Sequence, residues 1–500
     1  MLLDKFKTRE LIEINHYIGG QFQIPSSGEY FDSEDPYTGK MWARVARGNN
    51  DDANLAIDNA SRASDSWASL KPSERGRFLY RLADEIDRYS DELAQIEVRD
   101  NGKLYAEMSG QTRYIAEWYR YYAGLADKIE GSVIPTDKHN ILNYTQYEPL
   151  GVVAMITPWN SPLLLLTWKL APALAAGNVA VIKPSEFTSA STIAFMELID
   201  AVGFPPGVVN TVTGYGPEVG MEIIKHPKVA KVAFTGSDYS GQKVYEQAAS
   251  GIKHVCLELG GKSPNIVFED TNIDAAIGGV LSGIFAASGQ TCIAGSRLLL
   301  QRSIYDQFLE RLIDVAGAAR IGNPMLPETN VGPVATRPQF EKVLRYIKIA
   351  QAEGAQCVLG GGVYDGPGSV GGLMVQPTIF SNCRNDMTIA REEIFGPVLA
   401  TIPFDTEDEA YDIANDSAYG LGAGIWTSDI GRAHEGASRI KAGTIWVNTY
   451  RALSYTSPFG GYKRSGIGRE GGLKAIYEYL ETKSVWICTK PSTADPFVMR

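Results

Sequence analysis

Short apolar runs alternate with helical segments over a long stretch in the middle of the chain. The apolar runs lie at 152–156, 179–182, 208–212, 229–234, 255–257 and 266–268. The segments between them, with apolar residues at helical spacing, lie near 163–176, 188–202, 217–225 and 239–250. Because strands and helices that alternate in this way form a parallel sheet with helices on both faces, the pattern predicts an α/β fold.

A second series of the same kind follows and predicts a second α/β domain. We expect its helices near 273–287, 304–319 and 337–353, and its strands at 296–300, 355–359 and 398–403. The glycine-dense turn 259-LGGKSP-264 is expected to join the two domains.

Segments on either side of these domains have other patterns. Residues 51–130 are rich in helix formers, and they predict a helical lead-in with helices at 51–70, 73–100 and 103–131. The alternating stretch 141-ILNYTQY-147 predicts a strand of an extended hairpin, which we expect to serve an oligomer contact. The stretch 484-SVWICTK-490 predicts another strand, and the last ten residues are expected to be a tail.

Size and charge narrow the classes of function. A chain of 500 residues with 44% apolar residues is long enough for two or three domains, each with its own core. A net charge of -11 argues against a nucleic-acid partner. The start, MLLDKFKTRE, lacks the apolar core of a signal peptide, and no later run is long and apolar enough to span a membrane. We therefore expect a soluble, cytoplasmic protein with no membrane partner.

The five cysteines are scattered, with no C-x-x-C and no histidine or cysteine cluster at metal-ligand spacing. This pattern is typical of reduced thiols, and we expect no metal site. Four of them, Cys256, Cys357, Cys383 and Cys488, are interpreted as small structural side chains.

Glycine-bearing turns at the ends of predicted strands suggest a phosphate-bearing cofactor. They are 213-TGYGPEVG-220 and 235-TGSDYSG-241, and both precede predicted helices, whose free N–H groups can bind a phosphate. Neither is a G-x-G-x-x-G motif, and a tight turn needs glycine in any case. A third strand ends in 183-KPSE-186, where Lys183 can hold a phosphate or hydroxyl and Glu186 can accept hydrogen bonds from a ribose. A carboxylate there repels a 2′-phosphate, which favours NAD over NADP.

Cys292 is the candidate nucleophile. It lies in 287-ASGQTCIAGSR-297, a glycine-flanked loop after a predicted helix, where backbone N–H groups can face a reacting centre. The five histidines show no pattern of a cysteine protease. A lone cysteine is more often structural, so the loop by itself leaves both interpretations open.

Two polar residues at strand ends are candidates for proton transfer and charge stabilisation. Glu258 ends an apolar strand before two glycines, where burial would raise its carboxyl pKa and make it a general base; the alternative is a partly exposed strand end. Asn160, in 157-TPWNSP-162, can donate to an oxyanion, although an asparagine is also common in turns.

Eight motifs in one order carry a family resemblance. They are TPWN, KPSE, FTGS, LELGGKSP, GQTCIAGSR, EEIFGP, WVN and SPFGGYKRSGIGRE. From about Tyr17 to Lys490 the chain resembles the NAD(P)-dependent aldehyde dehydrogenase superfamily, including the separation of 34 positions from Glu258 to Cys292. The resemblance implies a Rossmann-type NAD-binding domain (1–130 and 150–260), an α/β catalytic domain (261–470), and a β oligomerisation arm with a tail (131–149 and 478–500). It also implies a homodimer or homotetramer.

The resemblance further implies a reaction and its residues. Cys292 would attack an aldehyde, Asn160 and the Cys292 N–H would hold the oxyanion, and water activated by Glu258 would release the carboxylic acid. The residues that correspond to cofactor contacts are Thr157, Pro158, Trp159, Lys183, Ser185, Glu186, Gly216, Phe234, Gly236, Ser237, Leu259, Glu393 and Phe395.

The substrate tunnel implied by the resemblance departs from many relatives. Its residues would be Ser161, Trp168, Ala286, Thr291, Ile293, Arg451, Leu453 and Phe459. Ser161 and Ala286 stand where relatives carry aromatic residues, so we expect a wider tunnel. Arg451 could meet a substrate carboxylate or phenol, or could be a solvated surface residue. These features predict a bulky, aromatic or anionic aldehyde.

Other functions remain open at this stage. A CoA-acylating relative generally lacks the base that Glu258 would supply, and the cation of a betaine aldehyde is disfavoured by Arg451. A semialdehyde-specific enzyme and a non-catalytic binding or structural descendant of the fold are the remaining alternatives, the latter disfavoured by the joint presence of Cys292, Glu258 and Asn160.

Overall fold

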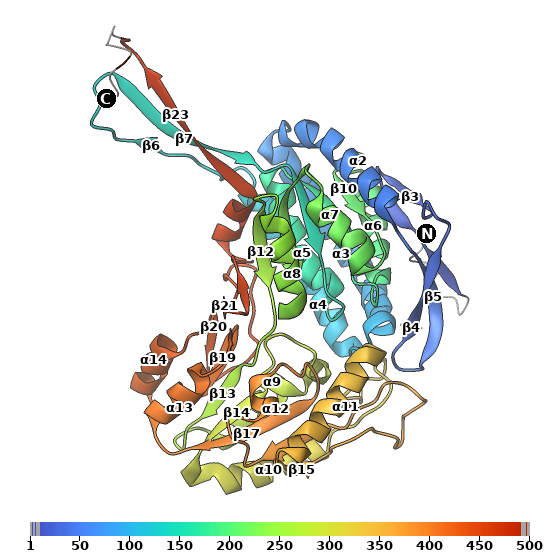
Figure 1. Cartoon of the computed structure of the whole chain (residues 1–500), viewed down its shortest axis with the longest axis vertical. Helices are drawn as coiled ribbons and strands as arrows, with labels where there is room; N and C mark the ends of the chain where they lie inside the picture. The colour runs from blue at the N-terminus through green and yellow to red at the C-terminus, as the bar shows by residue number, and fades with distance from the viewer. Residues whose placement is uncertain (1–2, 4–5, 7–10, 492–496, 498–500) are drawn as a thin grey trace.

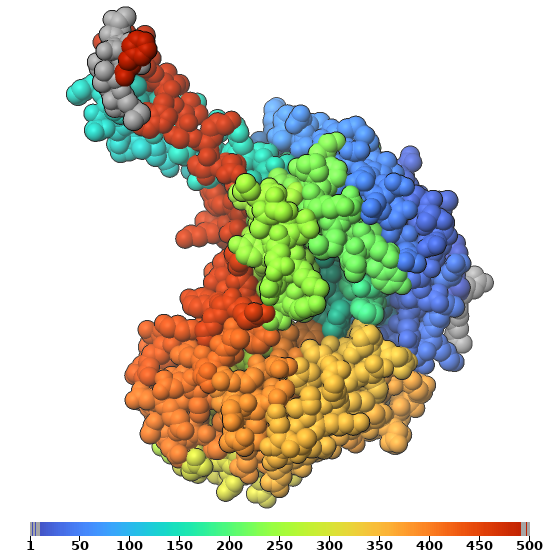
Figure 2. All heavy atoms as spheres, viewed as in Figure 1, coloured from blue at the N-terminus to red at the C-terminus, as the bar shows by residue number. Residues whose placement is uncertain are grey.

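The computed structural model describes residues 3, 6, 11–491 and 497. These residues form two lobes that meet over a broad contact, and a long β arm that projects away from both (Figures 1 and 2). Within the described part of the chain, no helix combines the length and the apolar character that a membrane crossing requires.

The first lobe is built on an eight-stranded sheet in the order β22-β12-β11-β8-β9-β10-β2-β3. Its five central strands are parallel and coincide with predicted apolar runs: β8 (Val152–Ile156), β9 (Val179–Lys183), β10 (Val209–Thr211), β11 (Val229–Thr235) and β12 (His254–Glu258). The edges are antiparallel additions from distant segments, namely β2 (His16–Ile18) with β3 (Gln21–Gln23), and β22 (Gly466–Ile467). The sequence pattern predicted none of these edge strands, because each is only two or three residues long.

Helices cover the two faces of this sheet, as its buried apolar strands require. Those between the strands are α5 (Pro162–Ala176), α6 (Ala190–Val202), a π-helical turn (Gly216–Gly220) that leads into α7 (Met221–Lys225), and α8 (Asp238–Ala249). The helical lead-in consists of α2 (Asn50–Ala68), α3 (Pro72–Asn101) and α4 (Tyr105–Leu125). The prediction that the last helix reaches residue 131 is wrong. A Cβ at Gly131 would lie 1.9 Å from the backbone oxygen of Thr145, so the chain there is already packed against the arm.

The second lobe contains a seven-stranded sheet in the order β15-β16-β17-β14-β13-β19-β20. Its strands are β13 (Pro264–Val267), β14 (Arg297–Gln301), β15 (Gln356–Leu359), β16 (Thr378–Ser381), β17 (Val398–Phe404), β19 (Gly422–Trp426) and β20 (Thr444–Val447), and only β15 is antiparallel to its neighbour. Its helices are α9 (Ile273–Ile284), α10 (Tyr305–Gly317), α11 (Arg337–Ala352), α12 (Thr388–Arg391), α13 (Glu407–Asn415) and α14 (Ile430–Arg439). The chain passes from the first sheet to the second between β12 and β13. The predicted α/β class is confirmed.

The arm is an antiparallel ribbon made from two distant parts of the chain. Strand β7 (Ile141–Pro149) pairs residue for residue with β23 (Leu480–Cys488), and the short β6 (Val133–Ile134) adds a third strand (Figure 1). The C-terminal strand therefore begins four residues before its predicted start. Of the expected tail, residues 492–496 and 498–500 lie outside the described part of the chain.

A separate three-stranded sheet near the N-terminus was not predicted. It consists of β1 (Ile12–Ile14), β5 (Lys40–Ala46) and β4 (Tyr30–Asp35) in the order β1-β5-β4. Two further short strands, β18 (Tyr419–Gly420) and β21 (Tyr462–Lys463), pair with each other, and the 3₁₀ segment Leu473–Tyr479 leads into the arm.

Candidate active site

The loop that carries Cys292 contains three consecutive residues in the left-handed region of φ. Helix α9 ends at Ile284, earlier than predicted, because Ala287 and Ser288 adopt left-handed φ values of 55° and 52°. Gly289 follows with φ 71°, and a Cβ there would lie 2.1 Å from the backbone oxygen of Gly396. The close approach to Gly396 therefore requires glycine at 289 and fixes the path of the chain into Cys292.

Two cavities meet at Cys292. The first, of about 120 Å³, is lined by residues from both lobes, and the second, of about 250 Å³, opens on the other side of the loop. Cys292, Asn160 and Leu165 line both cavities. A molecule in one cavity can thus reach the same sulfur atom as a molecule in the other.

The first cavity lies at the switch point of the first sheet. The chain runs from β8 outward through β9 to β10 and then returns to the other side of β8 to form β11. Segments at the carboxyl ends of β8 and β11, including Trp159 and Ser237, line the cavity. In doubly wound sheets this position is where nucleotides bind.

Most predicted cofactor residues lie around this cavity or along the neighbouring strand ends. Pro158, Trp159, Gly236, Ser237, Leu259, Glu393 and Phe395 line it. The rings of Trp159 and Phe395 meet edge to face, with centroids 5.2 Å apart. Glu393 accepts a hydrogen bond of 2.8 Å from the Gly261 N–H, and burial raises its pKa to about 7.

The remaining predicted cofactor residues follow the ends of the sheet strands outside that cavity. They are Thr157, Lys183, Ser185, Glu186, Gly216 and Phe234. Lys183 and Glu186 form an ion pair of 3.0 Å, and Lys183 packs 3.9 Å from the Cβ position of Gly220, so these groups gather beside the turn after β10.

Two features of these strand ends fit a dinucleotide. A Cβ at Gly216 would meet nothing within 4 Å, so the turn after β10 borders open space, and the Thr157 hydroxyl is buried without a partner. Ser237 caps α8 by accepting a hydrogen bond from the Ser240 N–H, which places the N-terminus of that helix at the first cavity.

Cys292 is a protonated thiol in this arrangement. Burial raises its pKa to about 12, and the nearby carboxyl groups of Glu393 and Glu258 act in the same direction. The N–H groups of Cys292 and Ile293 act in the opposite direction by donating to the sulfur. The thiol therefore needs a proton acceptor or an added positive charge to become a nucleophile.

Asn160 is held beside the sulfur by the opposite lobe. Its Nδ2 donates a hydrogen bond of 3.0 Å to the backbone oxygen of Gln290, and Gln290 Oε1 accepts one of 2.8 Å from the Ala335 N–H. An amide nitrogen carries two hydrogens, so the second remains for an oxygen atom in the cavities.

Glu258 lies behind the reaction centre rather than on its wall. Both carboxyl oxygens are buried with no hydrogen-bond partner in the part of the chain that the structure describes, and neither cavity has Glu258 in its lining. Burial raises its pKa well above the ordinary value, and the neighbouring Glu470 adds to this, while Lys169 and Arg469 act against it. Glu470 itself forms an ion pair of 2.6 Å with Lys169. Glu258 must therefore turn before its carboxylate can act as a base at the reaction centre.

Seven of the eight predicted tunnel residues line the second cavity. They are Ser161, Trp168, Thr291, Ile293, Arg451, Leu453 and Phe459. Ala286 does not line it, because α9 ends before this residue and the 3₁₀ turn that begins there carries it to one side.

The sequence analysis missed five residues of the second cavity: Gln111, Tyr114, Trp118, Leu164 and Leu165. The first three share one face of α4, at a spacing of three and four residues that was visible in the sequence. The ring of Trp118 stacks on Trp168 at 6.0 Å, and Trp168 meets Phe459 at 5.0 Å, so the cavity has an aromatic wall.

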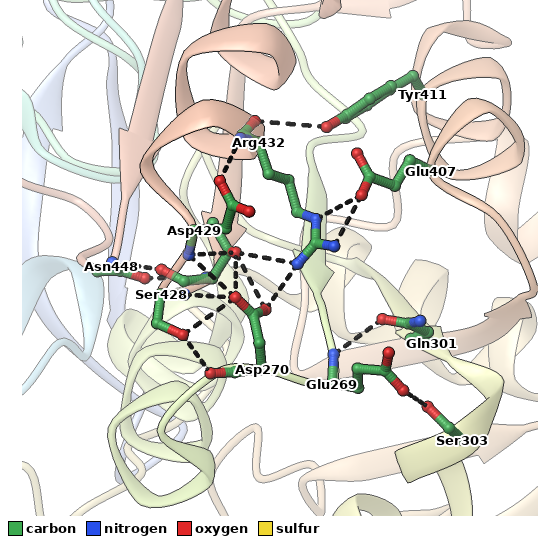
Figure 3. A network of polar contacts seen from close by, with 11 residues as sticks. Glu269, Asp270, Gln301, Ser303, Glu407, Tyr411, Ser428, Asp429, Arg432 and Asn448 are labelled. Atoms are coloured by element: carbon green, nitrogen blue, oxygen red, sulfur yellow. Dashed lines mark hydrogen bonds and ion pairs between the residues drawn. The ribbon is translucent and has the colours of Figure 1, made fainter.

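The segment that carries Arg451 is fixed by a polar network (Figure 3). Asn448 exchanges two hydrogen bonds with the backbone of Thr427. Asp270 accepts hydrogen bonds from the N–H groups of Ser428 and Asp429, and it forms an ion pair of 2.9 Å with Arg432. Arg451 then adopts φ 64° and donates to the Ser282 oxygen at 3.1 Å. Arg451 is therefore held in place where it lines the cavity.

Another missed residue is Lys103, in the loop between α3 and α4. Its Nζ donates a hydrogen bond of 2.7 Å to the Ser161 Oγ, and its side chain is buried. No local motif marks a lysine of this kind, since its partner is 58 residues away in the sequence.

The parallel sheet with a cavity at its switch point, and the thiol between that cavity and a second one, define a two-domain dinucleotide-binding protein. The chain belongs to the aldehyde dehydrogenase family, whose model matches residues 23–485. The family resemblance inferred from the eight motifs is thereby confirmed, and with it the expectation of an aldehyde dehydrogenase.

Relatives match almost end to end. The chain is 46% identical over 489 residues to the (Z)-2-((N-methylformamido)methylene)-5-hydroxybutyrolactone dehydrogenase of Acinetobacter baylyi, and the match covers 97% of this chain and 99% of that protein. It is 43% identical to the mitochondrial aldehyde dehydrogenase of Rattus norvegicus, over 94% of this chain and 91% of the rat protein. The crystal structure of betaine aldehyde dehydrogenase from Staphylococcus aureus in complex with NAD+ superposes with a TM-score of 0.97 at 38% identity, over 100% of this chain and 99% of that one.

Proposed function

We propose that this protein oxidises a bulky, oxygen-bearing aldehyde to its carboxylic acid with NAD, through a covalent intermediate on Cys292. The observation that carries the proposal is that Cys292 and Asn160 line both the cavity at the switch point and the cavity with the aromatic wall. A hydride acceptor in the first and an aldehyde in the second would meet at one sulfur atom.

The first half of the reaction forms a bond between sulfur and carbon. The Cys292 thiol gives its proton to the solvent, the thiolate adds to the aldehyde carbon, and the resulting oxyanion accepts hydrogen bonds from Asn160 Nδ2 and the Cys292 N–H. NAD supplies the hydride acceptor, and loss of hydride from the thiohemiacetal leaves a thioester on Cys292. Trp159, Glu393 and Phe395 would hold the nicotinamide side of NAD in the first cavity.

The second half releases the acid. A water molecule gives a proton to the Glu258 carboxylate as its oxygen attacks the thioester carbon, and the sulfur leaves as thiolate. The raised pKa of Glu258 suits this step, because a carboxylate with a raised pKa is a stronger base. This role also speaks against a CoA-acylating enzyme, in which a thiol would replace the water.

A carboxylate just after the end of β9 favours NAD over NADP. Glu186 stands there in an ion pair with Lys183, so a 2′-phosphate would meet a carboxylate. The solved structure from Staphylococcus aureus contains NAD+, in agreement with this preference.

The substrate preference follows from the walls of the second cavity. Trp118, Trp168 and Phe459 suit an apolar or aromatic body, while Arg451 suits a carboxylate, a phenol or another oxygen. The relative from Acinetobacter baylyi is named for a lactone with amide and hydroxyl groups, which agrees with an oxygen-rich substrate. Arg451 disfavours the trimethylammonium cation of a betaine aldehyde.

An NADH-formation screen tests this function. Aliphatic, aromatic, carboxylate-bearing and betaine aldehydes are each offered with NAD, with and without CoA, to the parent and to Cys292→Ala. We expect oxidation of aromatic and oxygen-bearing aldehydes without CoA, and none with Cys292→Ala. Equal rates in the variant would overturn the proposal, and no NADH from any aldehyde would favour a non-catalytic descendant.

We also propose that the arm pairs subunits into a homodimer or homotetramer. Trp486, Ile487, Leu142 and Val133 are exposed apolar residues on its strands. All five cysteines are free, which suits a reducing compartment such as the cytoplasm.

A further inference from the structure

Lys103 is an unusual buried cation beside the second cavity. Lys103 is 3% exposed, and the carboxylates of Glu107 and Glu97 act on its ammonium group through space. Its Nζ makes one hydrogen bond, of 2.7 Å, to the Ser161 Oγ. A buried ammonium is costly unless it has partners, so its contact with Ser161 calls for a functional explanation.

The direction of this hydrogen bond determines where the Ser161 hydrogen points. An ammonium group can only donate, so the Ser161 oxygen accepts, and its own hydrogen must point elsewhere. Ser161 precedes α5 but makes no capping hydrogen bond to it. Because Ser161 lines the second cavity with Cys292, the hydroxyl hydrogen is free for an acceptor atom inside that cavity.

The second cavity and its surroundings contain unpaired polar atoms as well as the aromatic wall. Gln111 Oε1 and Thr291 Oγ1, on residues that line the cavity, and Glu107 Oε2 are buried without partners among the described residues. The other Glu107 oxygen accepts a hydrogen bond of 2.7 Å from the Ala287 N–H. Gln111 and Thr291 thus bring polar atoms to the same cavity as the rings of Trp168 and Phe459.

We propose that the Ser161 hydroxyl, oriented by Lys103, donates a hydrogen bond to an oxygen atom that the substrate carries close to its aldehyde carbon. The enzyme would thus select aldehydes with an ether, carbonyl, hydroxyl or carboxylate oxygen at that position over their hydrocarbon counterparts. Ser161 is the specificity residue and Lys103 its positioning residue. This inference rests on the proposed aldehyde oxidation at Cys292.

The protonation state of Lys103 offers a second way to test how the Ser161 hydroxyl is oriented. Burial lowers its pKa to about 8; Arg451 acts in the same direction, while Glu107, Glu97 and Cys292 act against it. Below pH 8 the ammonium donates to Ser161. Above pH 8 the neutral amine can accept from Ser161, which turns the hydroxyl hydrogen away from the cavity.

The test compares methoxyacetaldehyde with butanal, which differ only in an oxygen atom that replaces a methylene group. The quantity measured is the ratio of their kcat/KM values, in which the titration of Cys292 cancels. We expect Ser161→Ala and Lys103→Met each to lower this ratio about fivefold to tenfold, the size of one hydrogen bond. The double variant should lower it no further than either single variant, and Lys103→Arg should retain it.

The pH dependence of the ratio separates positioning from a merely structural role. In the parent the ratio should fall between pH 7 and pH 9.5, and in Lys103→Arg it should not, because arginine stays charged. A ratio in Ser161→Ala equal to that of the parent would overturn the proposal. So would a Lys103→Met variant that loses activity on both aldehydes equally. If the parent oxidises neither these two aldehydes nor any aldehyde of the NADH-formation screen, the proposed function itself fails.

Discussion

Asn160 Nδ2 donates a hydrogen bond of 3.0 Å to the backbone oxygen of Gln290, two residues before Cys292. Asn160 follows β8 of the first sheet, and Gln290 precedes β14 of the second, so this bond joins the two lobes at the reaction centre. The amide therefore has a fixed orientation before any substrate arrives, which is what stabilisation of an oxyanion requires.

Replacement of Asn160 by alanine should remove one oxyanion donor. We expect kcat to fall about 10²-fold to 10³-fold, as for the loss of such a donor in other enzymes. Steady-state NADH formation with a good aldehyde measures the effect. Ser27→Ala, in an exposed turn, is a suitable control that should retain the parent rate. A loss of less than twofold in Asn160→Ala would exclude the amide from the reaction.

Replacement of Glu393 by glutamine should make Cys292 more reactive in the absence of cofactor. Ionised Glu393 raises the pKa of Cys292, so loss of this charge lowers it and increases the thiolate fraction. Because burial raises the pKa of Glu393 to about 7, the two proteins should differ little below pH 7, and the variant should react faster than the parent above it. The rate of alkylation of the Cys292 peptide by iodoacetamide, followed by mass spectrometry, measures this difference. Glu341→Gln, an exposed position on α11, should match the parent.

Replacement of Lys169 by methionine should both destabilise the fold and shift the pH profile. Its ion pair with Glu470 is fully buried, and removal of one partner of such a pair typically costs about 3–5 kcal/mol. Lys169 also lowers the pKa of Glu258, so its loss should move the rise of the deacylation rate to higher pH. Urea unfolding and the pH dependence of kcat measure the two effects. The exposed Lys128→Met should change neither quantity. An unchanged pH profile in Lys169→Met would show that Lys169 does not influence the pKa of Glu258.

Replacement of Glu186 by serine should relax the preference for NAD. Without the carboxylate at the end of β9, a 2′-phosphate no longer meets a like charge. We expect kcat/KM for NADP to rise at least about tenfold, the equivalent of about 1.4 kcal/mol. If NADP remains as poor a cofactor as in the parent, the adenosine ribose binds elsewhere.

Replacement of Arg451 by alanine tests recognition of an anionic substituent. The parent should prefer 4-carboxybenzaldehyde to benzaldehyde, and the variant should lose this preference, because Arg451 lines the second cavity. The ratio of kcat/KM for the two aldehydes is the measurement. Equal ratios in the two proteins would show that Arg451 is a surface residue that does not bind the substrate carboxylate.

The sequence predicted the central parts of this molecule because their causes are local. The five parallel strands of the first sheet are apolar runs that are buried on both faces, and such runs are recognisable without a structure. The catalytic candidates Cys292, Glu258 and Asn160 stand at strand ends and in a glycine-flanked loop, where their polarity is conspicuous.

The missed features depend on contacts between distant segments. The edge strand β22 pairs with β12 from more than 200 positions further along the chain, as the register Leu257 to Ile467 shows. The role of Lys103 follows only from its hydrogen bond to Ser161. Ala286 does not line the tunnel, and the two residues after it have left-handed backbone angles. Neither a periodicity nor a motif contains this information.

Mass spectrometry of the Cys292 peptide in Glu258→Gln tests the central claim most directly. The variant is mixed with NAD and an aldehyde that the parent oxidises, quenched within one turnover, and digested at low pH to preserve thioesters. The account predicts one NADH per active site and a mass increase on Cys292 that equals the acyl group of the substrate. A stoichiometric burst of NADH with Cys292 unmodified would contradict it.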